Sequence, residues 1–130
     1  MSRALIPIAD GTEEIELAAT ANVLVRGGFH VTVASVGSSK TCNLSRGLKV
    51  EADALLDDLQ EKTVFDVIVC PGGMPGAENL SKNHKLSGIL KHQAEEGCWV
   101  AGICAAPAVV LAPLGILQEK TATCYPSRPF

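Results

Sequence analysis

The chain contains very little of several features that mark particular classes of protein. Its 130 residues include one tryptophan, one tyrosine and three phenylalanines, and 11 basic residues stand against 14 acidic ones. The formal net charge of −3 provides no basic surface for nucleic acid, and no Lys/Arg cluster with interleaved aromatics occurs. We therefore expect no charge-driven binding of nucleic acid.

Long apolar runs are also missing. The longest, APAVVLAPLGIL, is interrupted by prolines and a glycine and is too short to span a bilayer. The N-terminal stretch MSRALIPIADG reaches Asp10 and Gly11 before it forms the apolar core of a signal peptide. These absences predict a cytoplasmic protein that does not enter a membrane.

The five cysteines include no C-x-x-C pair, and no Cys/His cluster has the spacing of a zinc site. In a reducing compartment they are expected to remain mostly free thiols. His84 and His92 lie in a polar segment with no second ligand type nearby. The sequence predicts neither a metal site nor a cofactor.

Hydrophobic periodicity alternates between strand and helix along a single domain, residues 1–130. It predicts strands at 3–9, 29–36, 65–70 and 99–104, weaker extended segments at 46–53 and 120–125, a polar loop at 37–43, and helices at 12–26, 54–60, 81–97 and 106–115. Thr12 is expected to cap the first helix, and Trp99 to lie in the core. This alternation is typical of an α/β sandwich with a mainly parallel sheet, whose ligands bind at the carboxyl ends of strands.

Cys104 falls where the fourth long strand meets a helix, in the stretch GICAAP. A nucleophile elbow needs such a turn with small neighbours, which Gly102, Ala105 and Ala106 provide. Pro107 suits the first turn of a helix, and a helix N-terminus favours thiolate over thiol. The N–H of Ala105 is expected to bind an anion. A cysteine that only packs in the core explains the same residues equally well.

Two other loops follow buried strands. If the N–H groups of Gly72 and Gly73 in the PGG turn face Cys104, they complete an oxyanion hole with Ala105; a plain strand-to-helix turn is the alternative. Glu16 stands in an otherwise apolar stretch of the first helix, where an inward-facing carboxylate must pair or take up a proton. Beside Cys104 it would deliver a proton during turnover.

The segments ADGTEEIE, VRGGFHVTVASV, SRGLKVEAD, FDVIVCPGGMPGAENL and VAGICAAPAVVLA together resemble the ThiJ/PfpI superfamily, in the branch of the Parkinsonism-associated deglycases and their bacterial homologues. The resemblance covers Arg3 to Lys120. It implies a flavodoxin-like three-layer sandwich, usually a homodimer. It also implies that Cys104 is a readily oxidised nucleophile and that Glu16 is the acid hydrogen-bonded to it.

The same resemblance implies a glyoxalase that works without glutathione, or a deglycase, acting on methylglyoxal, glyoxal and their early adducts with proteins or nucleotides. The alternatives are a redox sensor and chaperone, or an inactive interaction module. Arg26 and Arg46 match arginines near the dimer interface and the site entrance of relatives. Tyr125 stands where animal members have a histidine, and Cys124 adjoins it.

Relatives continue beyond the position of Phe130 with further strands and a helix, and the final residues SRPF do not resemble that continuation. The C-terminal part of the family fold is therefore expected to be missing. Apolar surface left uncovered would favour a homodimer or pairing with the missing segment.

Overall fold

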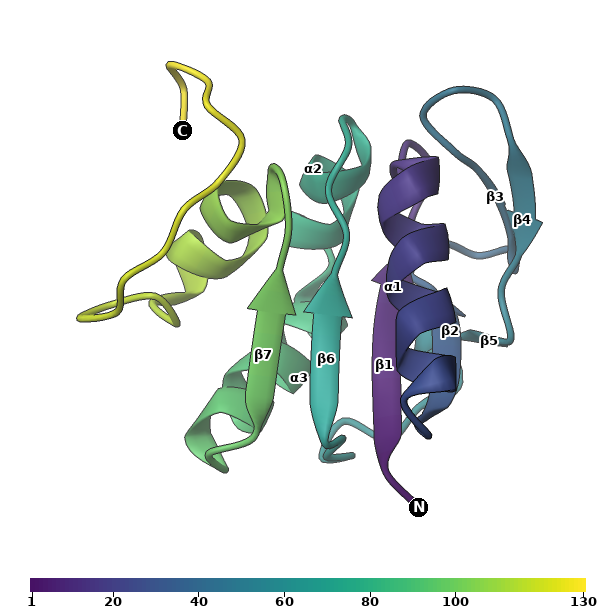
Figure 1. The fold of residues 1–130 in the computed structure, drawn as a ribbon, viewed down its shortest axis with the longest axis horizontal. Coiled ribbons are helices and arrows are strands. Elements are labelled where there is room, and N and C mark those ends of the chain that lie inside the picture. Colours follow the sequence, from purple (N-terminus) through teal and green to yellow (C-terminus); the bar gives the residue numbers. More distant parts are fainter.

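A computed structural model describes all 130 residues and contains one five-stranded sheet in the order β5-β2-β1-β6-β7 (Figure 1). Its strands are β1 (Arg3–Ile8), β2 (His30–Ser35), β5 (Ala54–Leu55), β6 (Val67–Cys70) and β7 (Trp99–Gly102). All four pairings are parallel. The expected α/β fold with a mainly parallel sheet is confirmed.

Helices lie on both faces of this sheet. Helix α1 (Glu14–Arg26) covers the front face in Figure 1, and α2 (Gly76–Ser81) and α3 (His84–Glu95) lie behind the sheet. A π-helical segment, η2 (Pro107–Leu111), continues into a 3₁₀ turn, η3 (Ala112–Leu114). The antiparallel hairpin β3 (Thr41–Asn43) and β4 (Lys49–Glu51) stands beside α1. No helix combines the length and apolar character needed to cross a membrane.

Strand β1 divides its side chains between two hydrophobic clusters, one on each face of the sheet. Leu5 joins a cluster of 16 buried residues that includes Ile68 and Leu90, whereas Ile6 and Ile8 join a smaller cluster of six. Successive side chains of a strand point to opposite faces, so a strand covered on both sides must be apolar throughout. This requirement explains why β1 is apolar from Ala4 to Ile8.

Two helix predictions are wrong in their boundaries because local hydrogen bonds compete with them. Thr12 does not cap α1: its buried hydroxyl accepts the N–H of Ala9 at 3.0 Å, and Glu13 provides the cap instead by accepting the N–H of Glu16 at 2.8 Å. The helix expected at 81–97 begins only at His84. Asn83 caps it by accepting the N–H of Leu86 at 2.8 Å, and this cap separates α3 from α2.

Other segments differ from the expected elements because tertiary pairing decides them. Residues 54–60 form the short strand β5 and one 3₁₀ turn, η1 (Leu56–Asp58), rather than a helix. The expected loop at 37–43 contains β3, and residues 120–125 form no strand. Trp99 is 77% exposed rather than buried, because β7 is the last strand at its edge of the sheet.

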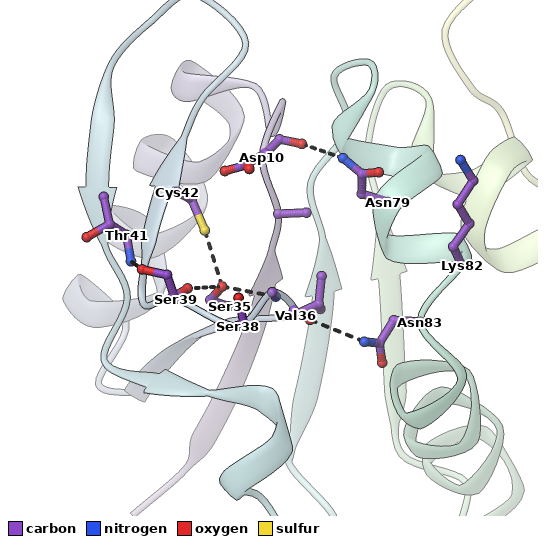
Figure 2. Close-up of a pocket in the computed structure, with 12 residues that line it drawn as sticks. Asp10, Ser35, Val36, Ser38, Ser39, Thr41, Cys42, Asn79, Lys82 and Asn83 are labelled. Carbon is purple, nitrogen blue, oxygen red and sulfur yellow. Dashed lines mark hydrogen bonds between the residues drawn. The ribbon is translucent and has the colours of Figure 1, made fainter.

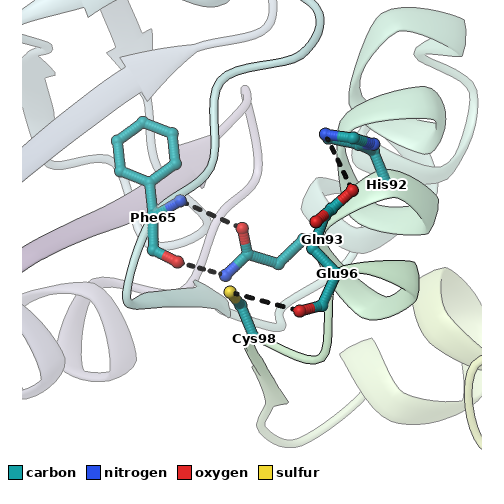
Figure 3. A network of polar contacts seen from close by, with 5 residues as sticks. All are labelled: Phe65, His92, Gln93, Glu96 and Cys98. Carbon is teal, nitrogen blue, oxygen red and sulfur yellow. Dashed lines mark hydrogen bonds and ion pairs between the residues drawn. The ribbon is translucent and has the colours of Figure 1, made fainter.

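Gln93 is a fully buried polar side chain of α3 that bonds to the backbone of two other segments, and Figure 3 shows its bonds to Phe65. Its Oε1 accepts the N–H of Phe65 at 3.0 Å, and its Nε2 donates to the carbonyls of Phe65 at 2.6 Å and Trp99 at 3.1 Å. The side chain therefore satisfies three backbone groups at the start of β6 and β7.

We expect Gln93→Leu to lower the free energy of unfolding by about 2–4 kcal/mol, because three buried or part-buried backbone groups lose their partner. Urea unfolding measures this change. Gln60→Leu is the matched control: Gln60 is exposed, and its variant should differ from the native protein by less than about 0.5 kcal/mol. Equal effects of the two substitutions would contradict the role given to Gln93.

Candidate active site

Strands β6, β1 and β7 lie near one another in the sheet, so the loops that follow them meet at its upper edge (Figure 1). The N–H of Glu13 donates to the carbonyl of Gly72 at 3.1 Å, joining the loop after β1 to the loop after β6. The N–H of Ile103 donates to the carbonyl of Cys70 at 3.2 Å, joining the loop after β7 to the end of β6. The three loops singled out from the sequence therefore form one continuous surface.

Cys104 occupies a strained turn between β7 and η2. Its φ of 61° lies in the left-handed region, which a side chain with a Cβ rarely adopts. Hydrogen bonds hold the turn on both sides: the N–H of Ala106 donates to Ile103 at 3.0 Å, and the N–H of Tyr125 donates to the carbonyl of Cys104 at 2.7 Å. Such strain persists where the surrounding structure enforces it, and it is common at functional sites.

Glu16 reaches this turn from the first turn of α1. Its Oε1 accepts the N–H of Gly72 at 2.8 Å, so this N–H holds the acid and does not serve the oxyanion hole expected from the sequence. A Cβ on Gly72 would lie 2.8 Å from both Glu16 Oε1 and the Cβ of Cys104. Only glycine therefore fits between the acid and the cysteine.

The other two expected donors, Gly73 and Ala105, have N–H groups with no acceptor elsewhere in the chain, and both favour the thiolate form of Cys104. Burial acts in the opposite direction and raises the pKa of the Cys104 thiol, and the negative charge of ionised Glu16 raises it further. The net direction is upward. The lowered pKa expected from a helix N-terminus is not found, because burial and Glu16 outweigh the N–H groups of Gly73 and Ala105.

The carboxyl group of Glu16 interacts directly with the sulfur of Cys104. An ionised Glu16 opposes the thiolate, whereas a Glu16 that has taken up a proton can donate a hydrogen bond to the sulfur and favour it. The arrangement therefore suits one proton moving between the sulfur and the carboxylate, with a single negative charge kept beside the N–H groups of Gly73 and Ala105.

A cavity of about 560 Å³ opens over this pair. It is lined by Glu13, Glu16, Ser45, Arg46, Gly73, Met74, Cys104, Ala105, Tyr125, Ser127 and Phe130. Two of the residues suggested for the pocket, Arg46 and Tyr125, are thus brought to Cys104. No three His, Cys, Asp or Glu side chains converge so that they could hold a metal ion.

The structure does not bring Arg26 or Cys124 into this cavity. Arg26 lies ten residues beyond Glu16 along α1, about 15 Å away at the rise of an α-helix. It lines a shallow hollow with Val25 on the outer side of α1. Cys124 lines a separate hollow beside η2, and its Sγ donates to the carbonyl of Tyr125 at 3.5 Å.

Glu14 is a site residue that the sequence did not reveal, since its place in the first turn of α1 suggested only a favourable helix-dipole contact. Its carboxylate accepts the Ser45 hydroxyl at 2.8 Å and the N–H groups of Arg46 at 2.7 Å and Leu48 at 3.3 Å. Burial acts to raise the pKa of Glu14, but these hydrogen bonds outweigh it and the pKa is lowered. Glu14 therefore ties the loop carrying Ser45 and Arg46 to the wall of the cavity.

A lowered pKa means that Glu14 stabilises this loop fully above its unfolded-state pKa and loses the effect as the pH falls through the lower folded-state value. We expect the amide resonance of Arg46 to titrate with a midpoint below the ordinary glutamic acid value of about 4.3. NMR titration of the labelled protein measures this, and Glu14→Gln should abolish the transition. A midpoint at or above the ordinary value would contradict the contact.

Comparisons with known proteins place these features in a recognised group. The model of the DJ-1/PfpI family matches residues 2–129. Protein DJ-1 homolog A of Arabidopsis thaliana is 48% identical over 94% of this chain and 31% of its own length. The glutathione-independent glyoxalase DJR-1.2 of Caenorhabditis elegans is 40% identical over 93% of this chain and 62% of its own.

The fold of the chain also matches that of a solved structure. The structure of oxidized Toxoplasma gondii DJ-1 superposes with a TM-score of 0.94 at 41% identity, covering 97% of this chain and 68% of that one. The chain thus spans about a third of the Arabidopsis protein and less than two thirds of the Caenorhabditis one. With a family model matched over nearly its whole length and a sheet that superposes on a DJ-1 structure, this chain belongs to the DJ-1/PfpI family.

Proposed function

We propose that the protein is a cysteine-dependent glyoxalase that needs no glutathione, acting on methylglyoxal or glyoxal, and that it also removes their early adducts from proteins and nucleotides. The observation that carries the proposal is the position of Cys104: it lies on a strained turn, beside Glu16, in an open cavity. The name of the Caenorhabditis relative supports the same chemistry.

In the first step, Sγ of Cys104 bonds to the aldehyde carbon of methylglyoxal. Because the pKa of the thiol is raised, a base must accept its proton as the bond forms, and the carboxylate of Glu16 faces the sulfur. Glu16 then passes this proton to the carbonyl oxygen, which becomes the hydroxyl group of a hemithioacetal. The unoccupied N–H groups of Gly73 and Ala105 suit the stabilisation of charge on that oxygen.

The second step moves a hydrogen between adjacent carbons. Glu16 removes the proton from the former aldehyde carbon, giving an enediolate, and returns it to the neighbouring carbon, while the hydroxyl proton passes from the former aldehyde oxygen to the neighbouring oxygen. The product is a lactoyl thioester on Cys104. Water then cleaves this thioester, releasing lactate and restoring the thiol, so the net reaction adds one water to methylglyoxal. Deglycation would start from an aldehyde adduct on an amine or thiol rather than from the free aldehyde.

Lactate formation from methylglyoxal by the purified chain tests the proposal. Steady production at a rate proportional to enzyme concentration supports it, and an absence of lactate above the uncatalysed rate contradicts it. The assay must use chain whose Cys104 is reduced, as shown by intact-mass measurement, because an oxidised sulfur cannot attack the aldehyde.

A redox sensor and chaperone is the second candidate, favoured by the partial exposure of Cys104 beside free N–H donors that suit sulfinate oxygens. Peroxide would oxidise the sulfur first to a sulfenic and then to a sulfinic acid, with reduction of two peroxide molecules to water. Mass spectrometry after peroxide treatment distinguishes the candidates. Rapid addition of two oxygen atoms at Cys104, without lactate formation in the reduced state, would favour the sensor.

We further propose a homodimer that uses the outer side of α1. The side chains of Ile15, Val23 and Val25 are 74%, 67% and 58% exposed there, and Arg26 adjoins them. Covering apolar groups favours association. We expect sedimentation to show a dimer that Val23→Asp weakens by at least about tenfold in dissociation constant, whereas Lys91→Asp, on α3, leaves it unchanged. A monomeric native chain at micromolar concentration would contradict the proposal.

A further inference from the structure

The cavity over Cys104 is several times larger than the aldehyde proposed as its substrate. Its volume is about 560 Å³. Methylglyoxal has five non-hydrogen atoms and fills at most roughly 150 Å³, if each atom takes the volume of one water molecule in the liquid. The cavity therefore has room for a much larger group on the ketone side of the substrate.

Three large apolar side chains line this cavity: Met74, Tyr125 and Phe130. Met74 follows Gly73 directly, and the two aromatic residues belong to the final segment of the chain. All three side chains are exposed, so each has apolar surface that a ligand can cover. Aromatic rings and the methionine sulfur both pack favourably against another aromatic ring.

The final segment, residues 121–130, is attached directly to the reacting residue. Its only backbone hydrogen bond to the rest of the chain joins the N–H of Tyr125 to the carbonyl of Cys104, at 2.7 Å. The N–H of Phe130 donates to the carbonyl of Ser127 at 3.0 Å, and two prolines restrict the backbone between the two rings. These constraints limit how far the rings can move from Cys104.

Most of the polar lining comes from other elements. Glu13 and Glu16 belong to the start of α1, and Ser45 and Arg46 belong to the loop that is hydrogen-bonded to it. In Figure 1 this loop and its hairpin lie beside α1, whereas residues 120–130 lie beyond β7. One substrate can therefore have its carbonyl groups near polar side chains and its apolar substituent against the two rings.

A second cavity, of about 460 Å³, lies at the carboxyl ends of β1 and β2 and differs in this respect (Figure 2). It shares no lining residue with the cavity over Cys104. Hydroxyl, amide and charged groups make up most of its lining, among them Ser35, Asn79 and Lys82, and no aromatic side chain lines it. The combination of a cysteine turn with aromatic side chains belongs to the first cavity.

We propose that the cavity over Cys104 selects α-oxoaldehydes whose ketone carries an aromatic or other bulky apolar group, and that Tyr125 and Phe130 make this selection. The inference rests on the proposed glyoxalase function and adds a substrate class to it. A phenyl group covers far more of the exposed ring surface than the methyl group of methylglyoxal does. Phenylglyoxal is the simplest such substrate, and addition of one water converts it to mandelate by the same steps.

Alkylation of Cys104 tests the apolar selection without any turnover. Iodoacetamide and iodoacetanilide each transfer a carbon to sulfur with loss of iodide, and the second carries a phenyl group on its nitrogen. We expect iodoacetanilide to alkylate Cys104 at least about tenfold faster, and the two reagents to alkylate Cys98 at rates within about threefold. Cys98 is also partly exposed but lines neither cavity. Peptide mapping by mass spectrometry measures both rates in one sample.

Substitutions of the two rings assign the preference to them. Tyr125→Ala and Phe130→Ala should each lower the ratio of the two alkylation rates at Cys104 at least about threefold, and the double variant should bring it close to the Cys98 ratio. Trp99→Ala removes an exposed ring outside the cavity lining and should leave the ratio unchanged. An unaltered Cys98 rate shows that each variant is folded.

Turnover extends the test to catalysis. We expect the ratio of kcat/KM for phenylglyoxal, measured as mandelate, to that for methylglyoxal, measured as lactate, to fall at least about tenfold in the double variant. Equal alkylation ratios at Cys104 and Cys98, or ratios that the double variant leaves unchanged, overturn the proposal. An alkylation preference that depends on the two rings, with neither product formed, contradicts the glyoxalase function but supports the apolar selection at Cys104.

Discussion

Cys104→Ser is expected to lower lactate formation from methylglyoxal by about 10³-fold or more. A hydroxyl group of similar size would occupy the same left-handed position, but it is a far weaker nucleophile than a thiol and leaves an ester that is harder to hydrolyse. Because the side chain is only partly buried and serine tolerates the same backbone, we expect the free energy of unfolding to change by less than about 1 kcal/mol.

Cys124→Ser is the matched control for this variant. Cys124 is also partly buried and lies twenty positions along the chain, but it lines a different hollow. Its replacement should leave kcat and KM within about twofold of the native values. If Cys104→Ser retained native turnover, or if the two variants lost activity equally, the glyoxalase mechanism proposed for Cys104 would be wrong.

Glu16→Gln is expected to lower kcat by about 10²-fold or more, with a smaller effect on KM. The amide keeps the size of the side chain and an oxygen able to accept the N–H of Gly72, but it cannot take a proton from the thiol or carry one between substrate carbons. Stopped-assay measurement of lactate gives both constants. Alkylation of Cys104 by iodoacetamide should persist, because the sulfur remains accessible from the cavity.

Gly72→Ala tests the role of Glu16 by displacing its carboxylate, without changing the carboxylate itself. The added Cβ would stand 2.8 Å from Glu16 Oε1 and must push the carboxylate from its place beside Cys104. We expect a loss of kcat comparable to that of Glu16→Gln, whereas Gly88→Ala, with open space around its Cβ, should leave kcat unchanged. Native turnover in Glu16→Gln would exclude the proton transfer proposed for this carboxylate.

The strands at the centre of the sheet were predictable because each is covered on both faces. An element in that position must be apolar wherever both of its faces are covered, and the runs at 4–9 and 67–70 show this directly. The segments at 54–60 and 37–43 were not predictable in the same way. Strand β5 in the first segment has two residues and pairs with β2, and strand β3 in the second has three residues and pairs with β4. Such short strands show no periodicity, so the pairing decides their conformation.

The candidate site divides along the same line. A strand-to-helix junction with small residues on both sides marked Cys104, and a carboxylate in an apolar helix marked Glu16, since both are local patterns. Other features depend on how separate segments approach one another: the hydrogen-bond partner of Gly72, the loop held by Glu14, and the distance of Arg26 from the cavity. Periodicity carries no information on those approaches.

The sequence by itself determined the family fold, the four long strands of the sheet, and the chemical groups available at the strand ends. Only the tertiary structure decided which groups meet: that the N–H of Gly72 holds the carboxylate of Glu16, that Glu14 holds the loop of Arg46, and that a second cavity forms beyond β1 and β2. The physical reason is the distance along the chain over which each effect acts. Burial patterns and turn chemistry act over a few neighbouring residues, whereas a site is built from side chains that are distant in the chain and close only after the sheet has assembled.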